Sequence, residues 1–164
     1  MITITDATTD SDYQNIEQLA NIIWRHHYIP ITGIDHVEYM LKKYQSAKAI
    51  EDQVKNGFEY YIMNYEEIPV GYLSILKEDQ SLFLSKIYVL SNYRGKKIGK
   101  AAMQFIEDKA KAYHLNKISL TVNRNNTNSI AAYEKMGFVN IGAKVKDIGS
   151  GYVMDDYLLE KTLN

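Results

Sequence analysis

The sequence predicts a single α/β domain with a mixed β-sheet, spanning residues 1–164, and three observations point to this fold class. The chain has the length of one ordinary domain and can bury a substantial core. Helical periodicity dominates up to about residue 57, and strand-like alternation replaces it from residue 58. Between residues 81 and 123, a strand, a helix and a second strand form a crossover unit, which joins parallel strands in a right-handed sense.

The first expected elements are a short strand and a long helix. Ile2 to Thr5 alternates as a strand does. Asp10 and Ser11 are helix-capping residue types, and they precede a segment whose apolar residues recur at helical spacing. The proline in the segment HHYIPITG, residues 26–33, is expected to break this helix and to leave the histidines in a loop over a cleft.

The remaining elements follow from the same signals. The glycines at 57 and 137 end helices, and the segment EEIP at residues 66–69 forms the turn of a hairpin. The expected elements are helices at residues 35–45 and 46–57, strands at 58–65, 70–77 and 81–90, a helix at 98–113, a strand at 115–123, a short helix at 126–138 and two closing strands at 138–146 and 151–163.

The composition excludes several classes of function. A net charge of −1 argues against a nucleic-acid-binding protein, which normally carries a basic surplus. The absence of cysteine excludes disulfides, thiolate nucleophiles and cysteine zinc sites. The four histidines lack the spacing of a metal site, so no metal is expected. Neither a leader-like N-terminus nor an apolar run of membrane-spanning length is present, which favours a cytoplasmic protein without a membrane partner.

The stretch NYRGKKIGKAAM, residues 92–103, places glycine and lysine at the start of a helix, where phosphate is often bound. A P-loop ending at Gly99-Lys100 would need glycine at 94 and a hydroxyl residue at 101, but the chain has Arg94 and Ala101. A dinucleotide fingerprint starting at Gly95 would need glycine at 97 and 100, and both positions are lysine. ATP hydrolysis and NAD binding are therefore disfavoured.

The physical properties of this turn still predict an anionic ligand. Gly95 and Gly99 let the backbone approach a ligand closely, and the helix N-terminus contributes partial positive charge. Cations in a first helical turn are unfavourable without an anion, by a few tenths of a kcal/mol each. The alternative is a basic helix start on a solvated surface. Four cations can neutralise a diphosphate without metal: Arg94, Lys96, Lys97 and Lys100.

The turn and a second motif together resemble the GCN5-related N-acetyltransferases, the GNAT superfamily. The segment from Tyr93 to Gly99 is similar to the acetyl-CoA turn of that family, usually Q/R-x-x-G-x-G/A, with Lys97 in place of the middle glycine. Residues 126–138 match N-x-x-[AS]-I-x-x-Y-x-x-x-G-F. The resemblance covers residues 2–162 and implies a mostly antiparallel mixed sheet with one splayed parallel pair, flanked by helices. The helical N-terminal region and the DYLLEK ending resemble the polyamine-acetylating branch less specifically.

The resemblance also implies roles for individual residues. The strand before the turn would offer backbone groups to the pantetheine arm of acetyl-CoA, the turn would hold the pyrophosphate, and Asn126 would bond the arm from the other side. The acetyl-CoA-binding residues implied in this way are Ile87, Tyr88, Val89, Arg94, Gly95, Lys96, Lys97, Ile98, Gly99, Lys100, Asn126 and Tyr133. A backbone N–H at Tyr88 or Val89 would stabilise the carbonyl oxygen.

Tyr133 stands at the position of the family's general acid. A thiol titrates near ~8.5 and a phenol near ~10, so protonation of a leaving thiolate by tyrosine is uphill by only about 2 kcal/mol. The alternative is a core tyrosine on an amphipathic helix, with Ile130 and Phe138 as neighbours. The motif position favours the catalytic interpretation.

The sequence defines the general base and the binding site of the acceptor amine less closely than it defines the general acid. Many polyamine-acetylating relatives carry glutamate where this chain has Ser85, so we expect water relayed by His26, His27 or Tyr28 to accept the proton. Adjacent residues on a strand point to opposite faces, so at most one of Asp155 and Asp156 can face the cleft, and Asp155 is taken as the acceptor-binding candidate. Solvated surface charge is the alternative role for each acidic candidate: Glu59, Asp147, Asp155 and Asp156.

These features predict an acetyl-CoA-dependent N-acetyltransferase that acts on a primary amine of a small, polyamine-like molecule. The absence of cysteine favours direct transfer in a ternary complex over an acyl-thiol intermediate. A protein or peptide acceptor, which would need an open groove, and a non-catalytic acyl-CoA-binding module are the alternatives. Terminal strands at a sheet edge make a homodimer plausible.

Overall fold

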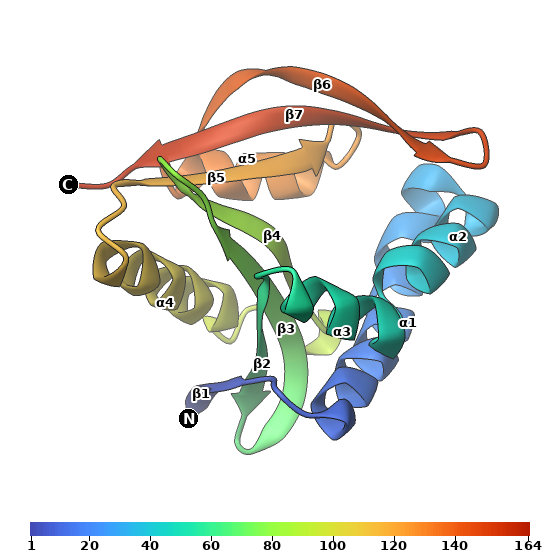
Figure 1. Ribbon diagram of the computed structural model, residues 1–164, viewed down its shortest axis with the longest axis horizontal. Coiled ribbons are helices and arrows are strands. Elements are labelled where there is room, and N and C mark those ends of the chain that lie inside the picture. Colours follow the sequence, from blue (N-terminus) through green and yellow to red (C-terminus); the bar gives the residue numbers. More distant parts are fainter.

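The computed structural model describes residues 1–164, whose strands form one seven-stranded sheet in the order β1-β2-β3-β4-β5-β7-β6 (Figure 1). No helix of the chain is long and apolar enough to cross a lipid bilayer. The strands are β1 (Ile2–Asp6), β2 (Glu59–Tyr65), β3 (Ile68–Lys77), β4 (Leu82–Val89), β5 (Lys117–Asn123), β6 (Val139–Gly149) and β7 (Tyr152–Thr162). The helices are α1 (Asp10–Thr32), α2 (Ile34–Tyr44), α3 (Ala47–Lys55), α4 (Ile98–Ala112) and α5 (Thr127–Lys135), with a 3₁₀ turn, η1 (Ser91–Tyr93).

The sheet opens between its two central strands. Neighbouring strands are antiparallel throughout, except for β4 and β5, which are parallel and paired only at Leu82–Ile118 and Phe83–Ser119. Beyond these residues the strands diverge, and Figure 1 shows β2 to β4 running down the view while β5 to β7 cross its top. The predicted mixed sheet with one splayed parallel pair is confirmed. The splay leaves the C-terminal half of β4 without a partner on its β5 side.

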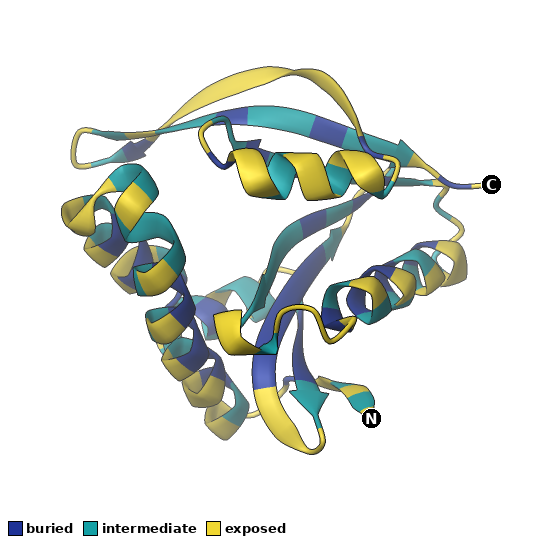
Figure 2. Cartoon of the chain, turned by 180° about the vertical axis from the view of Figure 1, so that it is seen from behind, coloured by how far each residue is buried: buried dark blue, intermediate teal, exposed yellow.

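Two hydrophobic cores lie on opposite faces of the sheet, and their residues alternate along β2. Figure 2 shows that the helices turn their buried residues toward the sheet. On β2, Tyr60 and Ile62 belong to the core with α1, α2 and α3, whereas Tyr61 and Met63 belong to the core with α4. This alternation follows from the period of two in a strand. The helices therefore hold the sheet from both sides and fix the two strands that flank the splay.

Helix α1 differs from its prediction at both ends. Its N-cap is Thr9, whose side chain accepts a hydrogen bond from the Asp12 backbone at 3.2 Å, so Asp10 and Ser11 lie inside the first turn. The expected break near Pro30 was wrong, because the helix continues to Thr32. Pro30 lies in the last turn. Its missing N–H removes one backbone hydrogen bond, and the cost is small there because the last carbonyl groups of a helix have no partner within the helix in any case.

Candidate active site

A cavity of about 640 Å³ lies where β4 and β5 diverge, and it is lined by residues of α1, α2, β4, the turn before α4, α4, β5, α5 and β7. It brings together residues that are distant in the sequence. The predicted site residues that line it are His27, Tyr28, Ser85, Ile87, Tyr88, Val89, Arg94, Gly95, Lys97, Ile98, Gly99, Asn126 and Tyr133.

Four predicted site residues lie outside this cavity: His26, Lys96, Lys100 and Asp155. His26 is exposed on α1, and the same helix carries His27 and Tyr28, so the prediction that these residues lie in a loop was wrong. The Lys96 Nζ lies 5.3 Å from the centre of the Tyr65 ring. Lys100 is exposed on the first turn of α4.

The turn before α4 has the geometry of an anion-binding site. Gly95 and Lys97 both adopt left-handed backbone angles, with φ of 81° and 66°. Lys97 is the N-cap of α4, and its side chain makes no capping hydrogen bond. The first N–H groups of the helix therefore stay free for a ligand. No atom lies within 4 Å of where a Cβ on Gly95 or Gly99 would stand, so there is room for a phosphate against the backbone.

The backbone of β4 offers donors to the splay. The Leu90 N–H donates to the Val70 carbonyl at 2.8 Å, so alternate N–H groups along β4, including that of Tyr88, face β3. The intervening N–H groups of Ile87 and Val89 face the splay, where β5 has moved away. Of the two predicted positions for a donor to the carbonyl oxygen, Tyr88 and Val89, the strand geometry favours Val89. An extended pantetheine arm can lie along this edge.

Polar side chains join α1 to α5 across the cavity. The His27 Nε2 lies 3.2 Å from the Asn126 Oδ1, so this carbonyl oxygen can accept the Nε2 proton and leave Nδ1 with the lone pair. Burial is the largest effect on His27 and lowers its pKa; Asn126 opposes this shift, and the positive charge of Arg94 adds to it. The ring is therefore uncharged at neutral pH and can accept a proton.

Tyr133 faces the same cavity from α5, and its ring packs against Phe138 with 5.6 Å between ring centres. Burial raises the pKa of the Tyr133 phenol, and the nearby Tyr28 raises it further. The phenol is therefore fully protonated at neutral pH. A raised pKa makes complete proton loss harder, so Tyr133 is best suited to donate a hydrogen bond to developing negative charge and to release its proton late.

The structure adds site residues that the sequence patterns did not identify. The Lys86 Nζ donates to the Tyr44 carbonyl at 3.1 Å, to Gln53 Oε1 at 2.9 Å and to the Tyr60 hydroxyl, which ties β4 to the α2–α3 junction. Burial lowers the pKa of Lys86 to about 7, although these acceptors favour its charged form. Trp24 and His36 also line the cavity. Of the acidic candidates only Asp156 lines it, so the choice of Asp155 as the acceptor-binding residue was wrong. The alternation along β7 indicated that only one of the two adjacent aspartates faces inward, but not which one.

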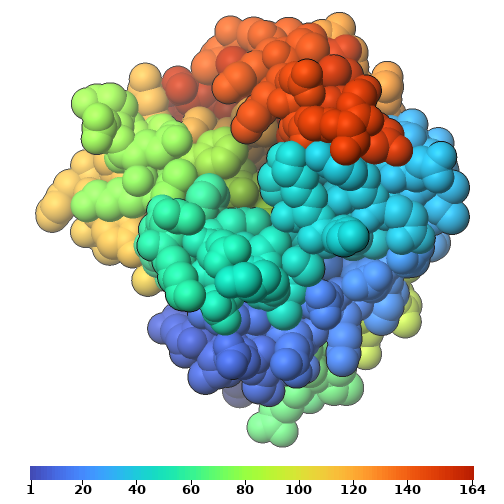
Figure 3. All heavy atoms as spheres, turned by 45° about the vertical axis from the view of Figure 1, so that its right-hand side comes forward, coloured from blue at the N-terminus to red at the C-terminus, as the bar shows by residue number.

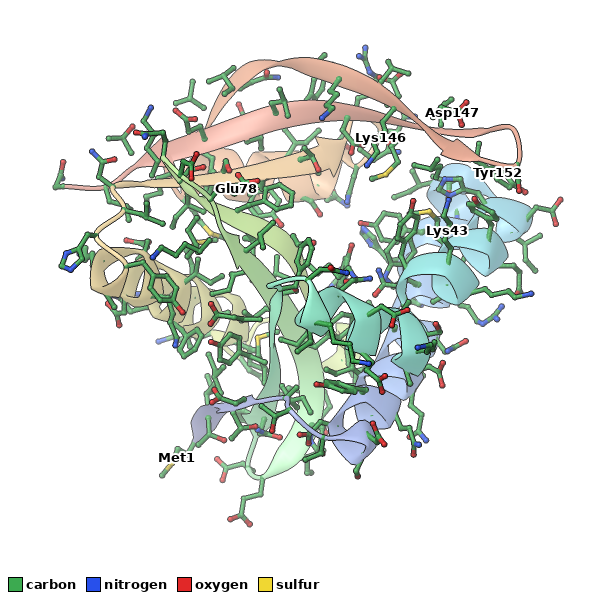
Figure 4. The ribbon with its side chains drawn as sticks, viewed as in Figure 1. Met1, Lys43, Glu78, Lys146, Asp147 and Tyr152 are labelled. Carbon is green, nitrogen blue, oxygen red and sulfur yellow. The ribbon has the colours of Figure 1, made fainter.

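The β6–β7 hairpin closes the cavity against α2. The Tyr39 hydroxyl of α2 donates to the Ile148 carbonyl at 2.5 Å, and Lys43 donates to the same oxygen. The ring of Tyr152 packs on that of Tyr39, with centres 4.9 Å apart. Figure 4 shows Lys43 and Tyr152 at this contact, and Figure 3 shows the atoms of the hairpin against those of α2. Four residues line the cavity beside it: His36 and Met40 of α2, and Val153 and Met154 of β7.

Comparison with known proteins agrees with this geometry. The sequence model of the Acetyltransferase (GNAT) family matches residues 16–138. The fold is similar to that of the PaiA N-acetyltransferase of Thermoplasma acidophilum, solved in complex with coenzyme A, with a TM-score of 0.80, 21% identity and 99% of each chain covered. A GCN5-related N-acetyltransferase of Rhodopseudomonas palustris gives a TM-score of 0.81, 16% identity and coverage of 98% of this chain and 95% of that one.

A chimera of the Vibrio cholerae spermidine N-acetyltransferase SpeG is also similar, with a TM-score of 0.70, 17% identity and coverage of 98% of this chain and 95% of that one. The family match spans both motifs, the acetyl-CoA turn and the segment with Tyr133. The free helix N-terminus, the open space at Gly95 and Gly99 and the unpaired edge of β4 fit coenzyme A. The chain therefore belongs to the GNAT family and is an acetyl-CoA-dependent N-acetyltransferase of class EC 2.3.1.

Proposed function

We propose that the enzyme transfers acetyl to the primary amine of a small, polyamine-like molecule. The observation that carries this proposal is the contact between the β6–β7 hairpin and α2, where Tyr39 and Lys43 both bond the Ile148 carbonyl. The contact bounds the cavity of about 640 Å³ beside α2, which suits a small acceptor, whereas a protein or peptide amine needs an open groove. The similarity in fold to a spermidine N-acetyltransferase is compatible with such an acceptor.

We propose direct transfer within a ternary complex. The chain has no cysteine to carry an acetyl group, so the amine attacks the thioester itself. The amine adds to the thioester carbonyl, whose oxygen accepts a hydrogen bond from the Val89 N–H. The C–S bond then breaks as the Tyr133 hydroxyl gives its proton to the leaving sulfur, and the nitrogen of the new amide returns its excess proton to the Tyr133 phenolate. The uncharged His27, which lines the cavity, accepts the proton that the ammonium group loses before the attack, directly or through water.

Release of CoA, measured with a thiol reagent, tests this proposal. Wild-type enzyme is expected to release CoA with mono-, di- and polyamines, and Tyr133→Phe is expected to lower kcat by about a hundredfold because the transition state loses its proton donor. The affinity for acetyl-CoA should remain within a few-fold. Turnover of lysine-containing peptides alone would contradict the small-molecule acceptor.

Tyr157→Phe is the matched control for the loss of a tyrosine hydroxyl. Tyr157 lies on β7 outside the cavity, with the guanidinium of Arg124 5.0 Å from its ring centre. Its kcat should equal that of the wild type. An equal loss of kcat in both variants would show that Tyr133 acts through packing and would contradict its role as the acid.

A further inference from the structure

One carboxylate lines the cavity, and it belongs to Asp156. The other charged side chains that line it are the cations Lys86, Arg94 and Lys97. Asp156 is 6% exposed and forms no ion pair. The adjacent Asp155 points to the other face of β7, where its Oδ1 lies 2.9 Å from the Nε of Arg124. Two neighbouring aspartates are therefore used differently: one forms a surface ion pair and one faces the cavity without a counter-charge.

The surroundings of Asp156 do not compensate its charge. Burial is the largest effect on this carboxyl and raises its pKa; Asp155 adds to the shift, and the Thr121 hydroxyl opposes it. Its cross-strand partner on β6, Lys144, is exposed and forms no ion pair with it. A buried carboxylate without a counter-ion destabilises the folded protein. Its presence in a cavity indicates a cationic ligand.

Three aromatic rings that pack on one another line the same cavity as this carboxylate. Trp24 packs against Tyr28 and Tyr88, with ring centres 4.3 and 5.6 Å apart, and Tyr28 lies 6.2 Å from Tyr88. The charge of Asp156 raises the pKa of Tyr28, and Tyr28 raises the pKa of Tyr133, so the carboxylate and the proposed acid each lie within electrostatic range of Tyr28. Aromatic faces attract ammonium groups in addition to a carboxylate.

We propose that Asp156, together with the rings of Trp24 and Tyr28, binds the ammonium group of the acceptor and selects amines that are cationic in solution. This inference rests on the proposed function, because it names the part of the site that recognises the amine. Asp156 acts as a binding and specificity residue, and the carboxylate holds the ammonium beside Tyr133 before the proton is lost. The amine then attacks from a position set by the side chains of Asp156 and Tyr133.

Binding can be measured without turnover, because Trp24 is the single tryptophan of the chain and lines the cavity. Titration of the CoA complex with n-butylamine and 1,4-diaminobutane should change its fluorescence saturably. Asp156→Asn should weaken this binding about a hundredfold, since loss of one partner of a buried charge pair is costly. Asp156→Glu should restore part of the affinity because it keeps the charge. Unchanged amine affinity in Asp156→Asn would overturn the proposal.

Asp155→Asn is the matched control, because it makes the same chemical change at the adjacent residue outside the cavity. Its amine affinity and kcat/KM should equal those of the wild type. Thermal unfolding separates recognition from a structural role: Asp156→Asn should raise Tm by a few degrees, about what removal of a buried unpaired charge predicts. A fall in Tm together with equal losses for cationic and neutral acceptors would identify a structural residue and overturn the proposal.

Steady-state kinetics distinguish failure of this inference from failure of the proposed function. If the wild type acetylates amines, Asp156→Asn should lower kcat/KM for n-butylamine about a hundredfold, mainly through KM, and should affect aniline, which is uncharged at neutral pH, far less. If Asp156→Asn keeps its kcat/KM for n-butylamine, the inference fails and the proposed function stands. If the wild type acetylates no small amine, the proposed function fails, and the inference fails with it.

Discussion

At the scale of single residues, the backbone angle of Lys97 shows how the acetyl-CoA turn keeps its shape although lysine replaces the usual glycine. Its φ of 66° is the left-handed conformation that glycine adopts without strain, and this is the position where the family usually has glycine. The fold thus keeps the backbone shape of the turn while a lysine occupies it, at a cost of about 1 kcal/mol. Its positive charge at the N-cap of α4 adds a smaller unfavourable contribution.

Lys97→Gly should therefore stabilise the empty enzyme, raising the free energy of unfolding by up to about 1 kcal/mol because the left-handed strain disappears. Urea denaturation measures this change. The backbone N–H groups that face the pyrophosphate remain, so the Kd for acetyl-CoA, measured by calorimetry, should stay within a few-fold. A hundredfold weaker affinity would show instead that the Lys97 ammonium binds phosphate directly. Lys96→Gly makes the same chemical change at the neighbouring residue, which does not line the cavity, and is the matched control for the loss of a lysine side chain.

At the scale of elements, the strands and most helices could be predicted because each carries its own periodic signal. The β2–β3 hairpin and the crossover of β4, α4 and β5 are examples, in which alternation and a 15-residue helix suffice. The end of α1 could not be predicted, since a proline is compatible with a last helical turn as well as with a break. Because the predicted helix ended before Pro30, the sequence placed His27 and Tyr28 in a loop, whereas they lie on α1.

The spacing between β3 and β4 can be tested at Gly71. A Cβ on this residue would lie 2.3 Å from the Tyr88 carbonyl oxygen, so Gly71→Ala should push β4 away and lower the free energy of unfolding by about 1–3 kcal/mol. Because β4 carries the donors for the pantetheine arm, acetyl-CoA affinity should fall as well. Urea denaturation and calorimetry measure the two effects. Wild-type stability and affinity would show that β4 does not depend on this close approach.

Gly99→Ala is the informative counterpart, because it separates stability from binding. No atom lies within 4 Å of the new Cβ, and alanine favours a helix over glycine, so stability should rise by about 0.5–1 kcal/mol. Acetyl-CoA affinity should nevertheless fall, since the methyl group fills the space for phosphate at the turn. Equal affinity would show that Gly99 is not in contact with the ligand.

At the scale of the whole molecule, the site could be predicted only where a motif fixes it in the sequence. The turn at Gly95 and the motif with Tyr133 are local patterns, so their residues could be named in advance. Lys86 and Asp156 reach the cavity through strand register and helix placement, which no local pattern encodes. Burial at this cavity also has a consequence for the whole molecule, because it shifts the pKa values of several ionisable groups at once.

The stability of the enzyme should depend on pH through two histidines beside the cavity and through Lys86, whose pKa of about 7 makes its contribution fall in the same direction as the pH drops through 7. Burial lowers the pKa of His27 and of His36 below the ordinary value of 6.5, so the unfolded chain binds more protons near that pH. The resulting stability is fully present above about 6.5 and is lost as the pH falls toward the folded pKa values. Carboxyl groups with lowered pKa, such as Glu38, titrate below this window.

Thermal unfolding between pH 7.5 and 5.5 measures this dependence. The Tm of the wild type should fall on acidification, and the double variant His27→Gln/His36→Gln should lose less, because glutamine has no proton to gain. His114→Gln, at an exposed position, should behave as the wild type does. Saturating acetyl-CoA should raise Tm at both pH values, as a ligand of the folded state does. An equal fall of Tm in the wild type and the double variant would show that other groups govern the acid sensitivity of the fold.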